Sequence, residues 1–147
     1  MKNSRSLRIT ALLIRTAMVL CVIALFMMPY AAEIYERESY RQGVVTVPLL
    51  ITFYSCAVFG FVILFTLDRL VKNIAEEKVF TGENVKLLRI LSYCCFVISF
   101  ITLLFARLRL LSFIVAFAAA FFGLILRVLK NCFEQALRLK EENDYTI

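Results

Sequence analysis

The sequence predicts an all-α, polytopic membrane protein with four antiparallel transmembrane helices, and two observations support this prediction. Hydrophobic residues make up 62% of the chain and its mean hydropathy is +0.84, whereas a soluble domain is typically about 45–50% apolar. Four runs of 17, 26, 17 and 17 residues contain no Asp, Glu, Lys or Arg: Thr16–Ala32, Gln42–Leu67, Ile90–Ala106 and Leu110–Leu126. Because roughly 20 helical residues, and at least about 17, span a bilayer's hydrocarbon core, residues 1–147 are expected to form one four-helix transmembrane domain.

The distribution of Lys and Arg predicts the orientation of the chain. Thirteen of these 17 residues lie before the first uncharged run, between the second and third, or after the fourth; only four lie in the other two gaps. Cytoplasmic segments of membrane proteins carry the excess of positive charge. Both termini are therefore expected in the cytoplasm. The net charge of +6 is attributed to orientation and to contact with membrane lipids, not to direct nucleic-acid binding.

The first span is expected at about residues 11–30, after a short basic arm at residues 1–10. The first uncharged run alone reaches only about 25 Å at helical rise, so the helix is expected to begin near Ala11. Arg15 then lies one turn inside the membrane boundary, where its long side chain can reach the headgroups. An ion pair with Asp68 is the alternative.

An outer loop at Glu33–Gly43 is expected to lead into a second span at about residues 44–67. Cys56 and Gly60, four residues apart, are candidates for close helix packing because small side chains let backbones approach. Past Leu67 the apolar residues keep helical spacing, which predicts a cytoplasmic extension of this helix; these residues are Leu70, Val71 and Ile74.

The third helix is expected to begin at Gly82, below the membrane, and to cross it at about residues 87–106. Thr81 suits the N-cap position, and Glu83 in the first turn suits the helix dipole. The tight turn Ala106–Arg109 then makes the third and fourth spans an antiparallel hairpin.

The fourth span, expected at about residues 110–127, carries two stripes. One consists of small residues, which are candidates for helix packing: Ser112, Ala116 and Ala120 at four-residue spacing, together with Gly123, four residues after Ala119. The other is aromatic and lies about 100° away around the helix: Phe113, Phe117 and Phe121. The aromatic stripe either packs against lipid and protein or lines a pocket for a lipid or another hydrophobic compound.

The fourth helix is also expected to continue past the bilayer to about Glu142, roughly 50 Å in all, whereas the hydrocarbon core is about 30 Å thick. Its apolar face persists beyond Arg127, and Glu134 and Arg138 are expected to pair across one turn. This face is predicted to pack against the Leu70–Ile74 stripe.

We call residues 68–86 and 128–147 together the cytoplasmic collar. Because its apolar face extends where only water or protein can meet it, the collar is predicted to bind a partner protein. The candidate docking residues are Phe80, Thr81, Asn84, Phe133, Asn143 and Asp144.

No catalytic constellation is recognisable in the sequence. The chain has no histidine and only four glycines, so the commonest general base is missing and a phosphate-binding loop is not expected. The five cysteines form no metal-binding spacing and are expected to pack as small hydrophobic residues. The sequence predicts a protein that is not an enzyme and holds no cofactor or metal.

Two segments resemble a bacterial membrane family: Val79–Ile90 with Ser92–Cys94, and Ile125–Asn131 with Lys140–Ile147. They are similar to the domain-of-unknown-function family two-nine-seven-five, small four-helix proteins often encoded beside a helix-turn-helix regulator. The resemblance implies a bacterial cell membrane protein that binds a small soluble regulator. We therefore expect a non-enzymatic regulatory or sensor protein. A transport or lipid-binding component is the alternative, and homo-oligomerisation remains open.

Overall fold

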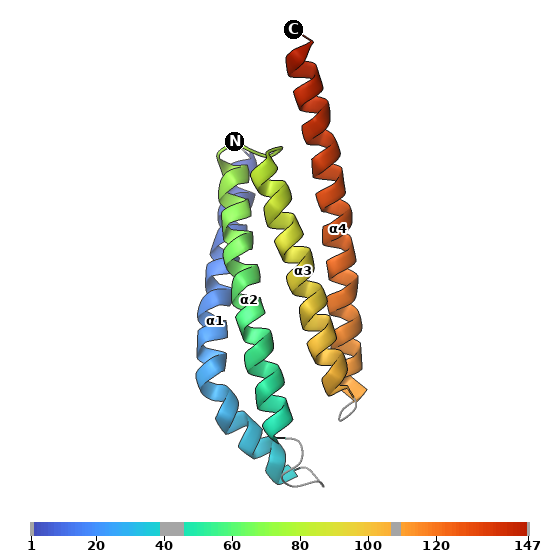
Figure 1. The fold of residues 1–147 in the computed structure, drawn as a ribbon. Coiled ribbons are helices and arrows are strands. Elements are labelled where there is room, and N and C mark those ends of the chain that lie inside the picture. The colour runs from blue at the N-terminus through green and yellow to red at the C-terminus, as the bar shows by residue number, and fades with distance from the viewer. Residues whose placement is uncertain (1, 39–45, 107–109, 147) are drawn as a thin grey trace.

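A computed structural model describes residues 2–38, 46–106 and 110–146, which form four long α-helices and, within these ranges, no strand (Figure 1). The helices are α1 (Lys2–Glu38), α2 (Thr46–Ala75), α3 (Gly82–Phe105) and α4 (Leu110–Tyr145). All four are long and apolar enough to cross a membrane. The all-α prediction with four potential spans is therefore confirmed.

The helix boundaries agree with the predictions at some points and correct them at others. α3 begins at Gly82 as predicted, and α4 continues to Tyr145, slightly past the expected end. The expected start of the first helix near Ala11 was wrong, because α1 is helical from Lys2; the basic segment at residues 1–10 contains no Gly or Pro to interrupt the helix. α1 also extends to Glu38, so the first half of the predicted outer loop is helical.

Two predicted connections lie at least partly outside the described residues. The remainder of the outer loop and the expected beginning of the second span fall within residues 39–45, and the predicted tight turn falls within residues 107–109.

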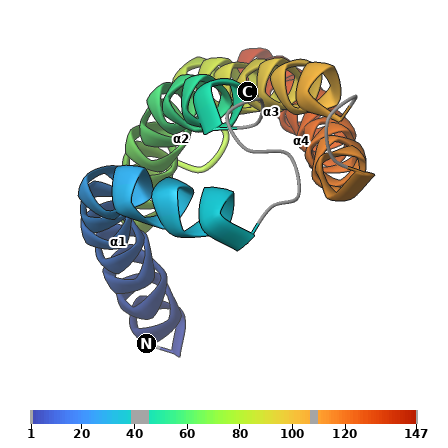
Figure 2. The same cartoon turned by 90° about the horizontal axis from the view of Figure 1, so that it is seen from below.

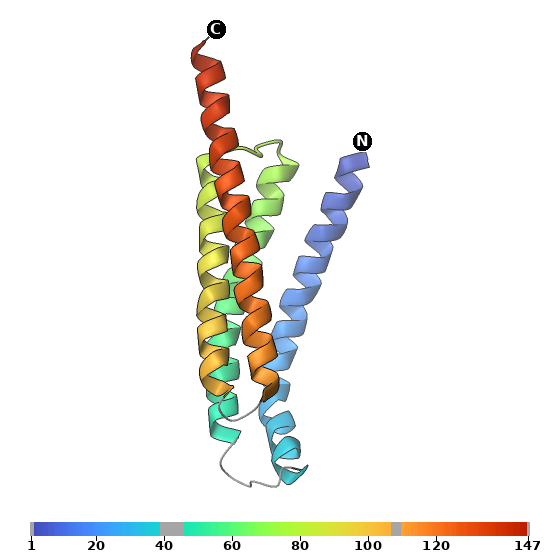
Figure 3. The same cartoon turned by 90° about the vertical axis from the view of Figure 1, so that its right-hand side faces the viewer.

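Each helix packs on its neighbour in sequence, and α3 with α4 forms the most extensive pair. Among the described residues, backbone contacts join α1 to α2, α2 to α3 and α3 to α4, but α4 contacts neither α1 nor α2 in this way. Viewed along the helices, the four form an open arc with α1 and α4 at its ends (Figure 2). The N-terminal half of α1 also diverges from the other helices (Figure 3).

The best-buried hydrophobic cluster consists of leucines from α2 and α3, near the connection between these helices: Leu70, Leu87, Leu88 and Leu91. Ile74 from α2 and Phe133 from α4 pack against it. The predicted collar stripes thus share one core, but α3 lies between α2 and α4 and supplies most of its surface. The Leu70–Ile74 stripe was expected to pack on α4, and Phe133 of α4 does pack against the cluster that contains Leu70; no backbone contact joins α2 to α4 among the described residues.

Pro29 lies inside α1 and leaves a backbone carbonyl without its helical partner. Proline has no N–H, so the carbonyl of Leu25, four residues earlier, cannot receive the usual helical hydrogen bond. The hydroxyl of Tyr54 on α2 donates to this oxygen at 3.2 Å. The interruption in α1 is therefore compensated by a hydrogen bond that fastens α1 to α2.

Candidate functional site

The connection between α2 and α3 is held by a regular helix-ending motif. The N–H of Lys78 donates to the carbonyl of Asn73 at 3.0 Å, and that of Glu77 donates to Ile74 at 3.1 Å. This is the hydrogen-bond pattern of a Schellman motif, in which the residue after the helix adopts the left-handed conformation, usually as glycine. Here Glu77 occupies that position with φ 61°.

Asn84 organises this connection from the inside and is fully buried. Its amide nitrogen donates to the carbonyls of Lys78 at 2.8 Å and Val79 at 2.7 Å, while its oxygen accepts from Asn73 Nδ2 at 2.8 Å. Both donors and the acceptor of the side chain are thus used. The prediction that Asn84 contacts a partner was wrong, because this side chain is enclosed by the connection that it stabilises.

Thr81 performs the predicted N-cap role. Its Oγ1 accepts from the backbone N–H of Asn84 at 3.3 Å, and its carbonyl accepts from that of Val85 at 3.2 Å. Arg69 of α2 also forms an ion pair with Glu83 in the first turn of α3, with 2.7 Å between Nε and Oε1. The end of α2 and the beginning of α3 are therefore held in one fixed arrangement.

A second ion pair lies within the connection itself. Lys78 Nζ is 2.9 Å from Glu76 Oε2, and this hydrogen bond lowers the pKa of Glu76 and raises that of Lys78. Both side chains are well exposed, and exposed ion pairs contribute little to stability. The rigidity of the connection comes from the Asn84 and Thr81 hydrogen bonds instead.

Two aromatic rings of the predicted docking set meet where this connection touches α4. The rings of Phe80 and Phe133 lie 5.4 Å apart between centroids and are tilted by 58°, a distance at which aromatic pairs attract each other. Phe80 is 41% exposed, whereas Phe133 is partly buried against the leucine cluster. Phe133 thus anchors α4, and Phe80 retains an exposed surface.

Beyond Phe133, α4 extends past the α2–α3 connection, and none of the other described helices lies beside its C-terminal end (Figure 1). Leu139 is 66% exposed and Tyr145 is 89% exposed; the predicted docking residues Asn143 and Asp144 are exposed in the same segment. Glu134, which was expected to pair with Arg138, instead forms an ion pair with Lys130, with 2.7 Å between Oε2 and Nζ. We call residues 138–146 the projecting segment.

Arg15 lies opposite Asp68, as one of the two predicted alternatives requires. The distance from Arg15 Nε to Asp68 Oδ1 is 4.0 Å, and the Arg15 side chain is 67% exposed. Asp68 is paired more closely with Lys72, at 2.7 Å, while its buried Oδ1 accepts no hydrogen bond. Arg15 therefore adds a weak contact between α1 and α2 and is still extended toward the exterior.

The small residues of α4 face α3. Ala116 is 2% exposed, and its carbonyl accepts from Ser99 Oγ at 2.7 Å. The carbonyl of Gly123 accepts from Ser92 Oγ at 2.9 Å, and a Cβ on Gly123 would lie 3.1 Å from Phe96 Cε1. Ser112 and Ala120, on the same stripe, are partly buried.

The packing surface predicted on α2, at Cys56 and Gly60, is not closely approached by a neighbouring helix among the described residues. A Cβ on Gly60 would have nothing within 4 Å, and Cys56 is only partly buried. The expected close approach at Gly60 is therefore absent from the described structure. The aromatic stripe of α4 points outward, with Phe113, Phe117 and Phe121 exposed by 53%, 70% and 56%.

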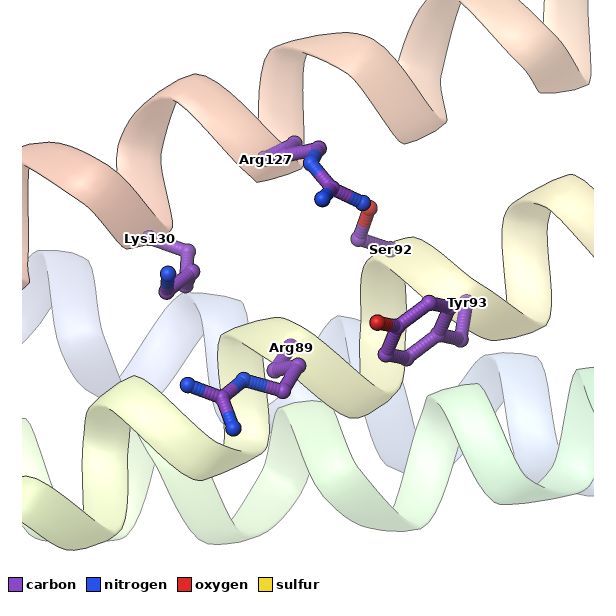
Figure 4. A pocket seen from close by; sticks show the side chains of 5 residues that line it. All are labelled: Arg89, Ser92, Tyr93, Arg127 and Lys130. Atoms are coloured by element: carbon purple, nitrogen blue, oxygen red, sulfur yellow. The ribbon is translucent and has the colours of Figure 1, made fainter.

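A small basic pocket lies between α3 and α4, which the sequence analysis did not predict (Figure 4). Arg89, Ser92 and Tyr93 of α3 and Arg127 and Lys130 of α4 line it. Arg89 lies 38 positions before Arg127 and 41 before Lys130 in sequence, so only the antiparallel register of two particular helices reveals their proximity. In the part of the chain that the structure describes, no three His, Cys, Asp or Glu residues form a metal-binding group.

Four helices that are long and apolar enough to cross a membrane, with charged residues concentrated at their ends, are those of a multi-pass membrane protein. The family described as "Protein of unknown function (DUF2975)" matches residues 35–147, and the chain belongs to that family. It is 24% identical to the uncharacterized membrane protein YoaS of Bacillus subtilis (strain 168), over 95% of this chain and 99% of that protein. No solved structure matches the chain.

Proposed function

We propose that this chain is a non-enzymatic regulatory or sensor protein of the bacterial cell membrane, whose projecting segment binds a small soluble regulator. Both termini are cytoplasmic in this proposal, and the four helices cross the bilayer in alternating directions. The excess of Lys and Arg at the corresponding ends supports that orientation.

The observation that carries the proposal is the length of α4. Its 36 residues extend about 54 Å at helical rise, well beyond a hydrocarbon core of about 30 Å. The projecting segment leaves Leu139 and Tyr145 exposed, at a level where no other described helix lies beside α4. A helix end that carries exposed apolar side chains can bind a groove on a partner protein. The resemblance to proteins encoded beside helix-turn-helix regulators favours a DNA-binding regulator as that partner.

The test is co-purification of the tagged full chain with the regulator encoded beside it, from its native membrane. Leu139→Glu, which places a charge on the exposed apolar face, is expected to abolish retention. Gln135→Glu is the matched control, since it adds the same charge at an exposed position of the same helix and should leave retention intact. Deleting residues 138–147 should alter transcripts controlled by the regulator. Unchanged retention and transcripts would refute the proposal.

One observation favours a second candidate, a component that binds lipid or another hydrophobic compound. A groove of about 530 Å³ lies between α1 and α2, beside the Pro29 interruption, and is lined mainly by apolar side chains. Recovery of a tightly bound hydrophobic compound, with no soluble regulator retained, would favour this candidate over the first.

A further inference from the structure

We propose that the basic pocket between α3 and α4 binds the phosphate of an anionic phospholipid headgroup. Five residues line it, and Figure 4 shows Arg127 and Lys130 extending from α4 toward α3, the Arg127 guanidinium beside Ser92, while Arg89 and Tyr93 lie on α3. Guanidinium and ammonium groups are the usual protein ligands for phosphate. This inference does not depend on a protein partner.

The position of the pocket along the helices favours a lipid as the source of the phosphate. Arg89 immediately precedes the uncharged run of α3, and Arg127 immediately follows that of α4. These runs cover only about 25 Å each at helical rise, somewhat less than a hydrocarbon core of about 30 Å. The pocket therefore lies at the boundary where the bilayer's phosphates are concentrated.

The charge balance of the pocket favours an anionic ligand. Lys130 is paired with Glu134 at 2.7 Å and contacts Asn131 Oδ1 at 3.1 Å. In the described ranges, neither Arg89 nor Arg127 forms an ion pair with a carboxylate. Glu134 also interacts electrostatically with Arg89, but one carboxylate does not balance three cations, and basic pockets between membrane helices suit anionic headgroups.

The polar groups at the base of the pocket restrict what it can hold. Ser92 is 3% exposed, and its hydroxyl donates to the Gly123 carbonyl at 2.9 Å, so its oxygen remains available only as an acceptor. The Arg127 guanidinium points toward this serine in Figure 4. The pocket is small, with a volume of about 30 Å³. It therefore admits phosphate oxygens, while the rest of the headgroup and the acyl chains remain outside.

The experiment measures lipids retained by the purified full chain in native mass spectrometry, after incubation with equal amounts of phosphatidylglycerol and phosphatidylcholine. Wild type is expected to retain phosphatidylglycerol preferentially. Since one Lys or Arg near a membrane surface is worth about a fivefold difference in binding, Arg89→Gln and Arg127→Gln should each lower that retention about fivefold. Arg127→Lys, which keeps the charge, should retain most of it.

Arg138→Gln is the matched control, because it removes a cation from α4 outside the pocket. It should leave the retention of phosphatidylglycerol unchanged. Equal retention of both lipids by wild type, or equal retention by wild type and Arg127→Gln, would overturn the proposal. Displacement of phosphatidylglycerol by millimolar inorganic phosphate would also overturn it, since the ligand would then be a soluble phosphate. If Arg127→Gln does not fold, Arg89→Gln and Arg127→Lys decide the question.

Discussion

Single residues decide where the helices of this protein end, and Glu77 shows how. It ends α2 in the left-handed region, at φ 61°, where a side chain crowds the following carbonyl and costs roughly 1–2 kcal/mol. Sequence reasoning did not identify this turn, because it lacks the glycine that usually signals such a helix end. The hydrogen bonds of Asn84 were not predicted either, because an asparagine in a polar segment of the sequence gives no indication that it is fully buried.

Glu77→Gly is predicted to stabilise the protein by up to about 1 kcal/mol, since glycine adopts the left-handed conformation without a side-chain clash. The measurement is thermal unfolding of the purified chain in detergent. Glu77→Ala is the control, because it removes the same charge but keeps a Cβ in the strained conformation. A gain for alanine as large as that for glycine would show that charge, and not backbone strain, is responsible.

At the scale of the helices, whether a small residue contributes to helix packing depends on whether another helix lies opposite it. Gly123 lies against Phe96 of α3, whereas Gly60 has open space where a side chain would be. The sequence assigned both to helix packing, on the same pattern of small residues four positions apart. That pattern indicates that a helix can be approached, but it cannot indicate whether another helix is present.

The pair Gly123→Leu and Gly60→Leu tests this difference. Leucine at position 123 would press on the Phe96 ring and separate α3 from α4, and overpacking of this kind typically costs about 1–3 kcal/mol. Leucine at position 60 is expected to be tolerated, since a Cβ there would meet no atom of a neighbouring helix within 4 Å. Thermal unfolding in detergent measures both, and equal destabilisation by the two substitutions would contradict the assignment of α3 and α4 as the tightly packed pair.

The beginning of α3 was predictable from local residues, while the arrangement of the helices was not. Thr81 and Gly82 mark a helix start through capping chemistry that operates within a few residues, and the structure has that start. The open arc and the basic pocket depend on which helix faces which. In a membrane, hydrophobicity does not decide this, because lipid and protein are similarly apolar.

At the scale of the whole molecule, the distribution of positive charge predicts how the protein is oriented in the membrane. One end of the molecule carries the N-terminus, the α2–α3 connection and the projecting segment of α4 (Figure 1). The segments at that end hold thirteen of the 17 Lys and Arg residues. Because positive charge is retained on the cytoplasmic side, that end is predicted to face the cytoplasm.

Reporter fusions test this orientation. Alkaline phosphatase, which is active only outside the cytoplasm, should be active when fused after Glu38 and inactive when fused after Lys78 or Tyr145. A fluorescent protein that matures only in the cytoplasm should give the opposite pattern at the same three positions. The reverse result would place the projecting segment outside the cell and remove it from any cytoplasmic regulator. The proposed phosphate site would not be affected, since both leaflets present phospholipid headgroups. The orientation therefore tests the regulator proposal independently of the phospholipid proposal.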